Sequence, residues 1–185
     1  MKKNWKWAVP VCIGAIVALA LFVFLIIGIV WYSQRRACYV IHFFPSLVTE
    51  IRIGSRKCNS EEFGVLDLSE FKNLKSVVIG DDSYRYVSEV KLIGLSELES
   101  VVIGKNSFTK KKNGFGKESN RRFYVKNCPL LRELRVGRYS FSDYASAVIE
   151  GNDALEVIAM GELSSESFNF YSASLELRSV GWMEC

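Results

Sequence analysis

The chain has 185 residues, of which 49% are apolar, and it carries a formal net charge of +4, five cysteines and one histidine. This length accommodates one domain and a membrane anchor. The charge is too small to indicate a nucleic-acid-binding protein, and one histidine leaves little material for a Ser-His-Asp or Cys-His catalytic arrangement.

Residues 1–7 form a short basic tail, and the next twenty-five residues, 8–32, carry no charge. As a helix, at about 1.5 Å per residue, this stretch would be about 37 Å long, enough to cross a hydrocarbon core about 30 Å thick. Two tryptophans precede it, and Trp31 and Tyr32 end it, as in interfacial aromatic belts. We predict a single transmembrane helix over 8–32. The alternatives are a cleaved signal peptide, whose apolar region is usually only about 7–15 residues long, and a buried core helix.

The charges that flank this span indicate its orientation. Three lysines and the terminal amine precede it, whereas Arg35 and Arg36 follow it in a juxtamembrane linker, 33–38. The cationic excess favours a cytosolic N-terminus and an extracellular or lumenal domain. None of the nine asparagines lies in an Asn-x-Ser/Thr sequon, which favours a cytosolic domain or a membrane without such glycosylation. We predict a single-pass membrane protein with an extracellular or lumenal domain, and the cytosolic alternative stays open.

A phrase recurs within residues 39–185: KSVVIG at 75–80 returns as ESVVIG at 99–104 and loosely as RELRVG at 132–137. Such an echo predicts a solenoid, whose turns bury their apolar faces against one another. Apolar residues stand three and five positions after each leading residue, and glycine follows at once. This pattern describes a short strand with one buried face. The leading residues are Val48, Leu74, Leu98, Leu131 and Leu155.

A second short strand is expected before each leading residue, with two inward positions per strand. After the glycine, three units continue into a serine and an aromatic residue, and we expect these rings to fill the interior at a corner. The pattern predicts a mainly β solenoid with two parallel ladders, little helix and about five turns, the last incomplete. The inward pairs are Val40 and His42, Leu66 and Leu68, Val90 and Leu92, Phe123 and Val125, Ala147 and Ile149, and Leu175 and Leu177.

These residues resemble a known repeat family. The segment Leu98–Ile103 fits the L-x-x-L-x-L frame of leucine-rich repeats. The glycine, the serine–aromatic corner and the phrase NCPLL at 127–131 look like the irregular, strand-rich leucine-rich repeats of bacterial and protist surface proteins. The resemblance implies the fold of residues 39 to about 180 and says little about function. The asparagine usual in such repeats is present only as Asn106, so no asparagine ladder is expected.

Four cysteines follow the apolar span: Cys38, Cys58, Cys128 and Cys185. They include no C-x-x-C pair, so no metal site is expected, and disulfide pairing cannot be read from their spacing. We interpret Cys58 and Cys128 as thiols without a chemical role. No polar cap follows the last unit, from which we expect either a truncated gene copy or, less favoured, an end paired with a partner.

Two surfaces are candidates for partner binding. The 33-residue repeat exceeds its 24-residue neighbours by nine residues, and the excess lies in the basic segment 109–122. Insertions in solenoids often form binding loops, so this one is a candidate for binding an acidic protein or anionic lipid, but the favoured interpretation is a solvated loop kept soluble by its charges. Its cationic residues are Lys110, Lys111, Lys112, Lys117, Arg121 and Arg122. Outward strand positions form the second surface, which suits protein contact or is ordinary exposed strand. They are Arg52, Val78, Val102 and Arg135.

The sequence predicts no enzyme. His42 is the only histidine, and no phosphate-binding glycine motif is present, so we expect no catalytic residue, cofactor or metal. We predict a non-catalytic, membrane-anchored repeat protein that mediates recognition or adhesion through a protein partner. The alternatives are a cytosolic-facing membrane organiser whose basic loop binds anionic lipid, and an inactive remnant of a larger repeat protein.

Overall fold

The structure, a computed structural model, describes residues 17, 19–26, 38, 45–110, 118–162 and 166–179 in two units, 1–39 and 40–185. In the first unit, the residues described at 17 and 19–26 are helical, and their large apolar side chains are 44% to 72% exposed. Across the described ranges, we find no helix with the length and apolarity that crossing a bilayer requires. Much of the predicted span lies outside these ranges, so the anchor stays a prediction.

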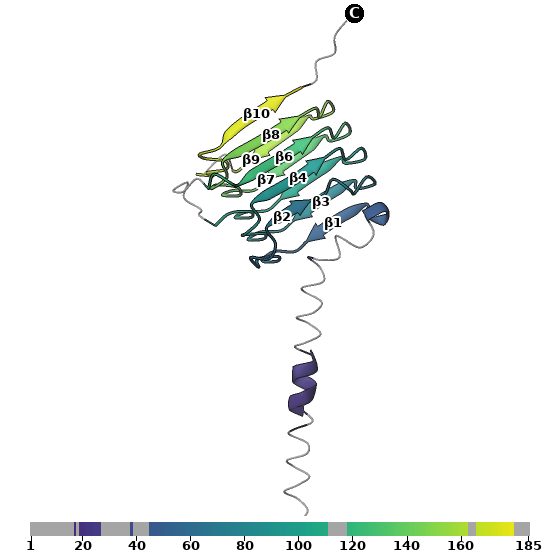
Figure 1. The fold of residues 1–185 in the computed structure, drawn as a ribbon, viewed down its shortest axis with the longest axis vertical. Helices are drawn as coiled ribbons and strands as arrows, with labels where there is room; N and C mark the ends of the chain where they lie inside the picture. The colour runs from purple at the N-terminus through teal and green to yellow at the C-terminus, as the bar shows by residue number, and fades with distance from the viewer. Residues whose placement is uncertain are drawn as a thin grey trace, which may run out of the picture. The chain divides into compact units, whose positions relative to one another are not determined.

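The second unit is a β-solenoid of two parallel five-stranded sheets (Figure 1). One sheet, sheet A, contains β1 (Glu50–Ile53), β3 (Ser76–Ile79), β5 (Ser100–Ile103), β7 (Glu133–Val136) and β9 (Val157–Met160). The other, sheet B, contains β2 (Val65–Asp67), β4 (Glu89–Ile93), β6 (Arg122–Lys126), β8 (Ser146–Glu150) and β10 (Ser174–Arg178). A short 3-10 helix, η2 (Pro45–Leu47), precedes β1. Successive strands alternate between the sheets, which confirms a mainly β solenoid of about five turns with little helix.

Sheet A confirms the predicted register of the main strands. The first inward column aligns Ile51, Val77, Val101, Leu134 and Ile158 as direct Cα partners. The second inward column is formed in the same way by Ile53, Ile79, Ile103, Val136 and Met160. Three of the leading leucines are fully buried behind these columns: Leu74, Leu98 and Leu131. The apolar period of two therefore identified the core correctly.

Sheet B also follows the predicted offsets. Its first inward column contains Leu66, Val90, Phe123, Ala147 and Leu175. Leu68 lies one residue beyond β2, but it is fully buried and donates its N–H to the Lys91 carbonyl at 2.9 Å. Val40 and His42 were predicted as an inward pair that precedes the pair Leu66 and Leu68. Both lie outside the described residues, so this prediction is untested.

Aromatic rings stack along one corner of the solenoid. Tyr84, Phe108, Phe141 and Phe170 follow one another with ring centroids 5.2, 4.8 and 5.0 Å apart and interplanar angles of 8°, 5° and 6°. All four residues have positive φ angles, from 49° to 59°. The sequence predicted the first three rings. Phe170 was missed because Asn169, not serine, precedes it.

A ladder of serines runs along the same corner. Each serine hydroxyl donates to a glycine carbonyl in the preceding turn, as Ser107 does to Gly80 at 2.8 Å. The same hydroxyl accepts the N–H of Ser83 at 3.1 Å, so it bonds to that turn twice. In the last turn, the Asn169 side-chain amide donates to the Gly137 carbonyl at 2.8 Å and takes over the first of these bonds.

The cysteines behave differently from one another. Cys128 is a buried free thiol, as predicted, and burial raises its pKa. The interpretation of Cys58 as an inert thiol was wrong, because Cys38 and Cys58 are both disulfide-bonded. The spacing of cysteines along the sequence does not show which of them form disulfides, so it did not reveal this.

Gly137→Ala should destabilise the solenoid, since a Cβ there would lie 2.5 Å from the Gly104 carbonyl carbon and 2.6 Å from the Lys105 nitrogen. These are backbone atoms, and overpacking of this kind costs about 1–3 kcal/mol. Gly54→Ala is the matched control, because no heavy atom lies within 4 Å of its added Cβ. Urea unfolding of the full chain in detergent should show a clear loss for Gly137→Ala only. Equal losses at both positions would contradict the close-stacking explanation.

Candidate functional site

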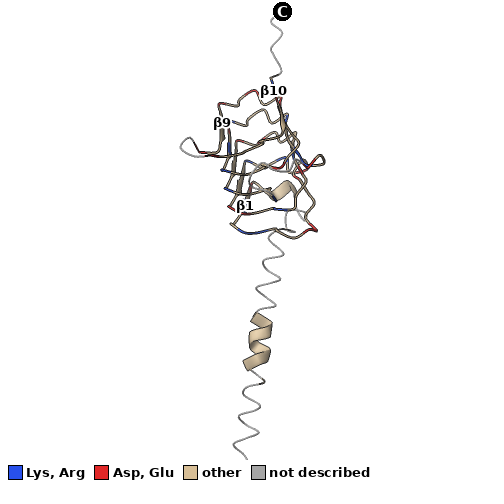
Figure 2. Ribbon diagram, turned by 90° about the vertical axis from the view of Figure 1, so that its left-hand side faces the viewer, with Lys and Arg blue, Asp and Glu red and all other residues tan. Residues whose placement is uncertain are grey.

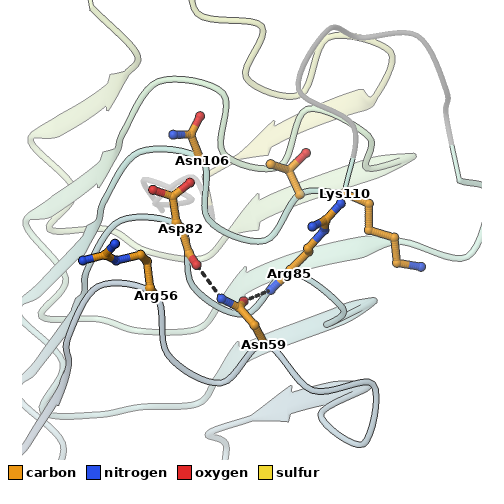
Figure 3. A pocket seen from close by; sticks show the side chains of 7 residues that line it. Arg56, Asn59, Asp82, Arg85, Asn106 and Lys110 are labelled. Atoms are coloured by element: carbon orange, nitrogen blue, oxygen red, sulfur yellow. Dashed lines mark hydrogen bonds between the residues drawn. The ribbon is translucent and has the colours of Figure 1, made fainter.

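A polar groove of about 490 Å³ lies along the corner of the solenoid that follows sheet A (Figure 3). We call it the corner groove. It is lined by Arg56, Asn59, Asp82, Arg85, Asn106, Thr109 and Lys110. Three successive turns contribute to it, so its shape depends on the stacking of the repeats.

Left-handed backbone conformations align part of the lining. Arg56, Asp82 and Asn106 have φ angles of 59°, 54° and 57° and occupy the same position in consecutive turns. Asparagine and aspartate tolerate this conformation better than most residues. Backbone bonds join each to the next turn, as when Asp82 donates its N–H to the Lys105 carbonyl at 2.8 Å. The groove is therefore lined by residues held on a regular backbone.

Asn59 joins the first two turns. Its Nδ2 donates to the Asp82 carbonyl at 2.7 Å, and its Oδ1 accepts the Arg85 N–H at 2.8 Å (Figure 3). These two hydrogen bonds connect the turn that carries Arg56 with the turn that carries Arg85. We interpret Asn59 as a positioning residue rather than as a ligand-binding one.

The groove is cationic on balance. Arg56, Arg85 and Lys110 line it against a single acid, Asp82. Arg85 and Lys110 both approach the Tyr86 ring, at 5.9 and 5.6 Å from its centroid. Two cations beside one aromatic ring form a surface suited to an anionic group.

The basic insertion begins and ends beside this groove. Asp143, from the next turn, accepts the Lys110 N–H at 2.9 Å through Oδ2, and its carbonyl accepts the Glu118 N–H at 3.0 Å. Lys110 Nζ also lies 3.3 Å from Glu118 Oε2. The two ends of the insertion therefore meet on one residue of the neighbouring turn. Residues 111–117, which include the predicted Lys111, Lys112 and Lys117, lie outside the described residues.

Arg121 is not a surface residue, contrary to its predicted place in an exposed basic segment. Its side chain is fully buried, and Nη1 lies 3.4 Å from Asp143 Oδ2. Its Nη2 donates to the carbonyls of Arg85, Val87 and Phe108 at 3.1, 2.8 and 2.9 Å. The guanidinium carbon lies 4.7 Å from the centre of the Tyr144 ring. Arg121 is a structural clamp beneath the insertion.

The other candidate residues lie elsewhere. Arg52, Val78, Val102 and Arg135 align as one outward column of sheet A, as predicted. Arg52 forms an ion pair with Glu50 at 2.5 Å, and Arg135 forms one with Glu133. Arg122 is exposed and lies in sheet B between Glu89 and Ser146. The outward column of sheet A and the described residues of the basic segment therefore stay two separate sets, as predicted.

Charges on the outer face of sheet B also pair locally. Lys91 lies 3.0 Å from Glu89, whose hydrogen bond raises the pKa of this lysine. Lys126 lies 3.0 Å from Glu150 and, through this bond, lowers the pKa of the carboxyl. Figure 2 shows acidic and basic residues distributed over successive turns. Within the described ranges, no group of three His, Cys, Asp or Glu residues is placed to hold a metal ion.

Comparison of the chain with protein-family models, curated proteins and solved structures found no match. Any functional conclusion therefore rests on the geometry of the molecule.

Sequence reasoning found only Lys110 among the groove residues. A signal was present for three others, because Arg56, Asp82 and Asn106 each stand two residues before a position of the corner column. This shared position identifies groove residues only once the left-handed backbone at these residues is known.

Arg121→Met should cost about 3–5 kcal/mol of stability, because it removes the guanidinium from a buried ion pair with the Asp143 carboxylate. The double variant Arg121→Met/Asp143→Asn should recover part of this loss. Arg122→Met, at an exposed neighbouring position, is the control and should change stability by no more than about 0.5 kcal/mol. Urea unfolding of the full chain in detergent measures all three. A small loss for Arg121→Met would show that the clamp does not hold this region together.

Proposed function

We propose that this is a membrane-anchored leucine-rich-repeat protein whose solenoid binds an acidic segment of a protein partner in the corner groove and catalyses no reaction. The observation that carries the proposal is the lining of the groove by Arg56, Arg85 and Lys110 against Asp82 alone. The parallel solenoid and its repeated columns support the leucine-rich-repeat assignment.

The uncharged stretch 8–32 supports the anchor. Its described part is helical, and large apolar side chains such as Leu19, Phe22 and Phe24 are 66%, 59% and 72% exposed. Exposed apolar side chains around a helix suit a lipid environment and are costly in water. The anchor would hold the solenoid at a membrane surface.

The cysteines support an extracellular or lumenal domain. Cys38 and Cys58 are disulfide-bonded, and disulfides persist mainly in oxidising compartments. This agrees with the orientation that the flanking charges favour. In that compartment, the groove would face secreted or cell-surface partners.

An acidic partner fits the groove better than a basic or apolar one. Arg56 and Arg85 are exposed, and Tyr86 offers a ring beside Arg85 and Lys110. Arginine pairs with carboxylates in a bidentate geometry. The lysines at 111, 112 and 117 follow Lys110 in the sequence and add positive charge to the adjoining segment.

Anionic lipid is the second candidate ligand, favoured by the same basic segment. Each cation close to a charged leaflet contributes up to about 1 kcal/mol. This function requires a cytosolic-facing solenoid, because anionic lipids concentrate in the cytoplasmic leaflet. The disulfide-bonded cysteines weigh against that orientation.

The two functions predict opposite topologies. In sealed microsomes from cells that express the full chain, added protease should leave residues 40–185 intact until detergent opens the vesicles. A cytosolic marker digested in the same sample and a lumenal marker that survives serve as controls. Digestion of the solenoid in intact vesicles would contradict the extracellular or lumenal assignment and support lipid binding.

Charge reversal tests the groove. Arg56→Glu and Arg85→Glu should each weaken binding of a fluorescent poly-glutamate peptide by about fivefold, as expected for one exposed charge contact. Arg132→Glu is the control, since Arg132 is exposed and its ion pair with Glu156 lies outside the groove. Fluorescence anisotropy of the full chain in detergent, at low and high salt, measures the affinities. Equal weakening by the control would show that binding follows net charge rather than the groove.

A further inference from the structure

Among the described residues, the apolar side chains of β9 and β10 are exposed at the C-terminal end of the solenoid, which we call the open end. Ile158, Leu175 and Leu177 are 39%, 46% and 58% exposed. In the preceding turn, the residues of the same columns are buried: Leu134, Ala147 and Ile149 are 0%, 0% and 3% exposed. Within the described part of the chain, β9 pairs only with β7 and β10 only with β8, so each has a free edge.

We propose that a second copy of this chain covers the open end, with β10 of one copy paired antiparallel to β10 of the other around a two-fold axis at Leu177. Three observations carry this inference: the direction of the backbone groups of β10, the order of charges along it, and the difference between the two ends of the solenoid.

The backbone of β10 presents suitable groups at its free edge. Ser174 donates its N–H to the Ala145 carbonyl, and the Arg178 carbonyl accepts the Gly151 N–H, both at 3.0 Å. Residues 174, 176 and 178 therefore direct their backbone groups toward β8. Backbone groups alternate along a strand, so Leu175 and Leu177 direct theirs to the free edge. Two antiparallel strands centred on Leu177 would exchange both N–H and carbonyl bonds between the two leucines.

The charges of β10 favour this register. Glu176 and Arg178 lie on the outward face and pair along the strand at 2.6 Å, with side chains 43% and 61% exposed. An antiparallel pair centred on Leu177 places Glu176 of each copy opposite Arg178 of the other. The charges that face each other directly across the two strands then have opposite signs. A register centred on Glu176 would place two glutamates directly opposite each other, which is destabilising.

A second copy also matches both sheets at once. A two-fold axis perpendicular to the two sheets would pair β9 with β9 of the other copy as well as β10 with β10. Both pairs would be antiparallel. Such an isologous contact sets the same exposed apolar side chains against one another, so the two surfaces match in chemistry.

The opposite end of the solenoid does not offer an equivalent surface. Ile51, Ile53 and Leu66, in the first turn, are only 6%, 5% and 8% exposed. A head-to-tail stack would have to pair the open end with this covered one. The two-fold arrangement uses only the open end and closes after two copies.

Charge reversal on β10 tests the contact in the full chain in detergent, with self-association measured by sedimentation. The unaltered chain should form dimers. Glu176→Arg and Arg178→Glu should each weaken dimerisation by about tenfold, because each turns two attractive cross-strand pairs into repulsive ones. A mixture of the two variants should form a heterodimer of nearly unaltered strength, since arginines of one copy then face glutamates of the other. Lys75→Glu is the control and should dimerise normally, because Lys75 is exposed and precedes β3, which is separated from β9 by β5 and β7.

Recovery in the mixture would also show that both variants fold. The inference is overturned if the unaltered chain stays monomeric, which would fit an end covered by the same chain or by a different partner. It is equally overturned if the mixture associates no better than either variant alone, because dimerisation would then arise elsewhere, as in the predicted membrane helix.

Discussion

The distance between successive turns governs this molecule. Parallel strand pairing holds neighbouring backbones about 4.8 Å apart, and every residue in a column must accept that spacing. At the corner after sheet A, it leaves no room for a side chain at Gly137, where an added Cβ would lie 2.5 Å from the carbonyl carbon of Gly104. Four residues after the glycine, in the same corner, the spacing suits flat rings, and Phe108 and Phe141 stack with centroids 4.8 Å apart. The serine hydroxyls bond across the same gap. The glycines, the serines and the aromatic rings of this corner therefore each fit the same spacing between successive turns.

This constraint explains how the solenoid tolerates an insertion. Extra residues leave the column after Thr109 and must return to it at Arg122, in register with Glu89 and Ser146. The return is held by Arg121, which bonds to carbonyls of the preceding turn and to Asp143 of the following one. A buried charge pair contributes little net stability compared with a packed apolar pair, but removing either partner is costly. We therefore interpret the clamp as a device that specifies where the insertion closes.

Local patterns sufficed for the strands and failed for the contacts between turns. The apolar period of two and the glycine that ends it identified both inward columns, because each of these features is present within a single repeat. Arg121 looked like one more cation of a solvated loop, since its acceptors belong to turns on either side. Asn169 hid the fourth ring, because its longer side chain reaches the same glycine carbonyl that serine reaches in other turns.

The corner groove was hidden for a related reason. Arg56, Asp82 and Asn106 differ in charge and size, so no sequence repeat connects them. They share a left-handed backbone conformation, which places each of them at the same position of the corner in its own turn. Side chains there are free of the core, and the repeat therefore constrains their backbone and not their chemistry. The side chains at this position can therefore vary in chemistry from turn to turn without a change in fold.

The corner groove and the open end differ in the forces that act on them. In the corner groove, Arg56 and Arg85 are exposed and salt screens their charges, so the affinity of the proposed acidic partner would depend on how many cations it engages at once. At the open end, the free strands offer directed backbone hydrogen bonds and apolar side chains, and charge mainly selects the register. A contact of the first kind changes with ionic strength and tolerates many acidic sequences. One of the second kind depends on a strand of matching length and alternation, which the last turn of an identical chain supplies.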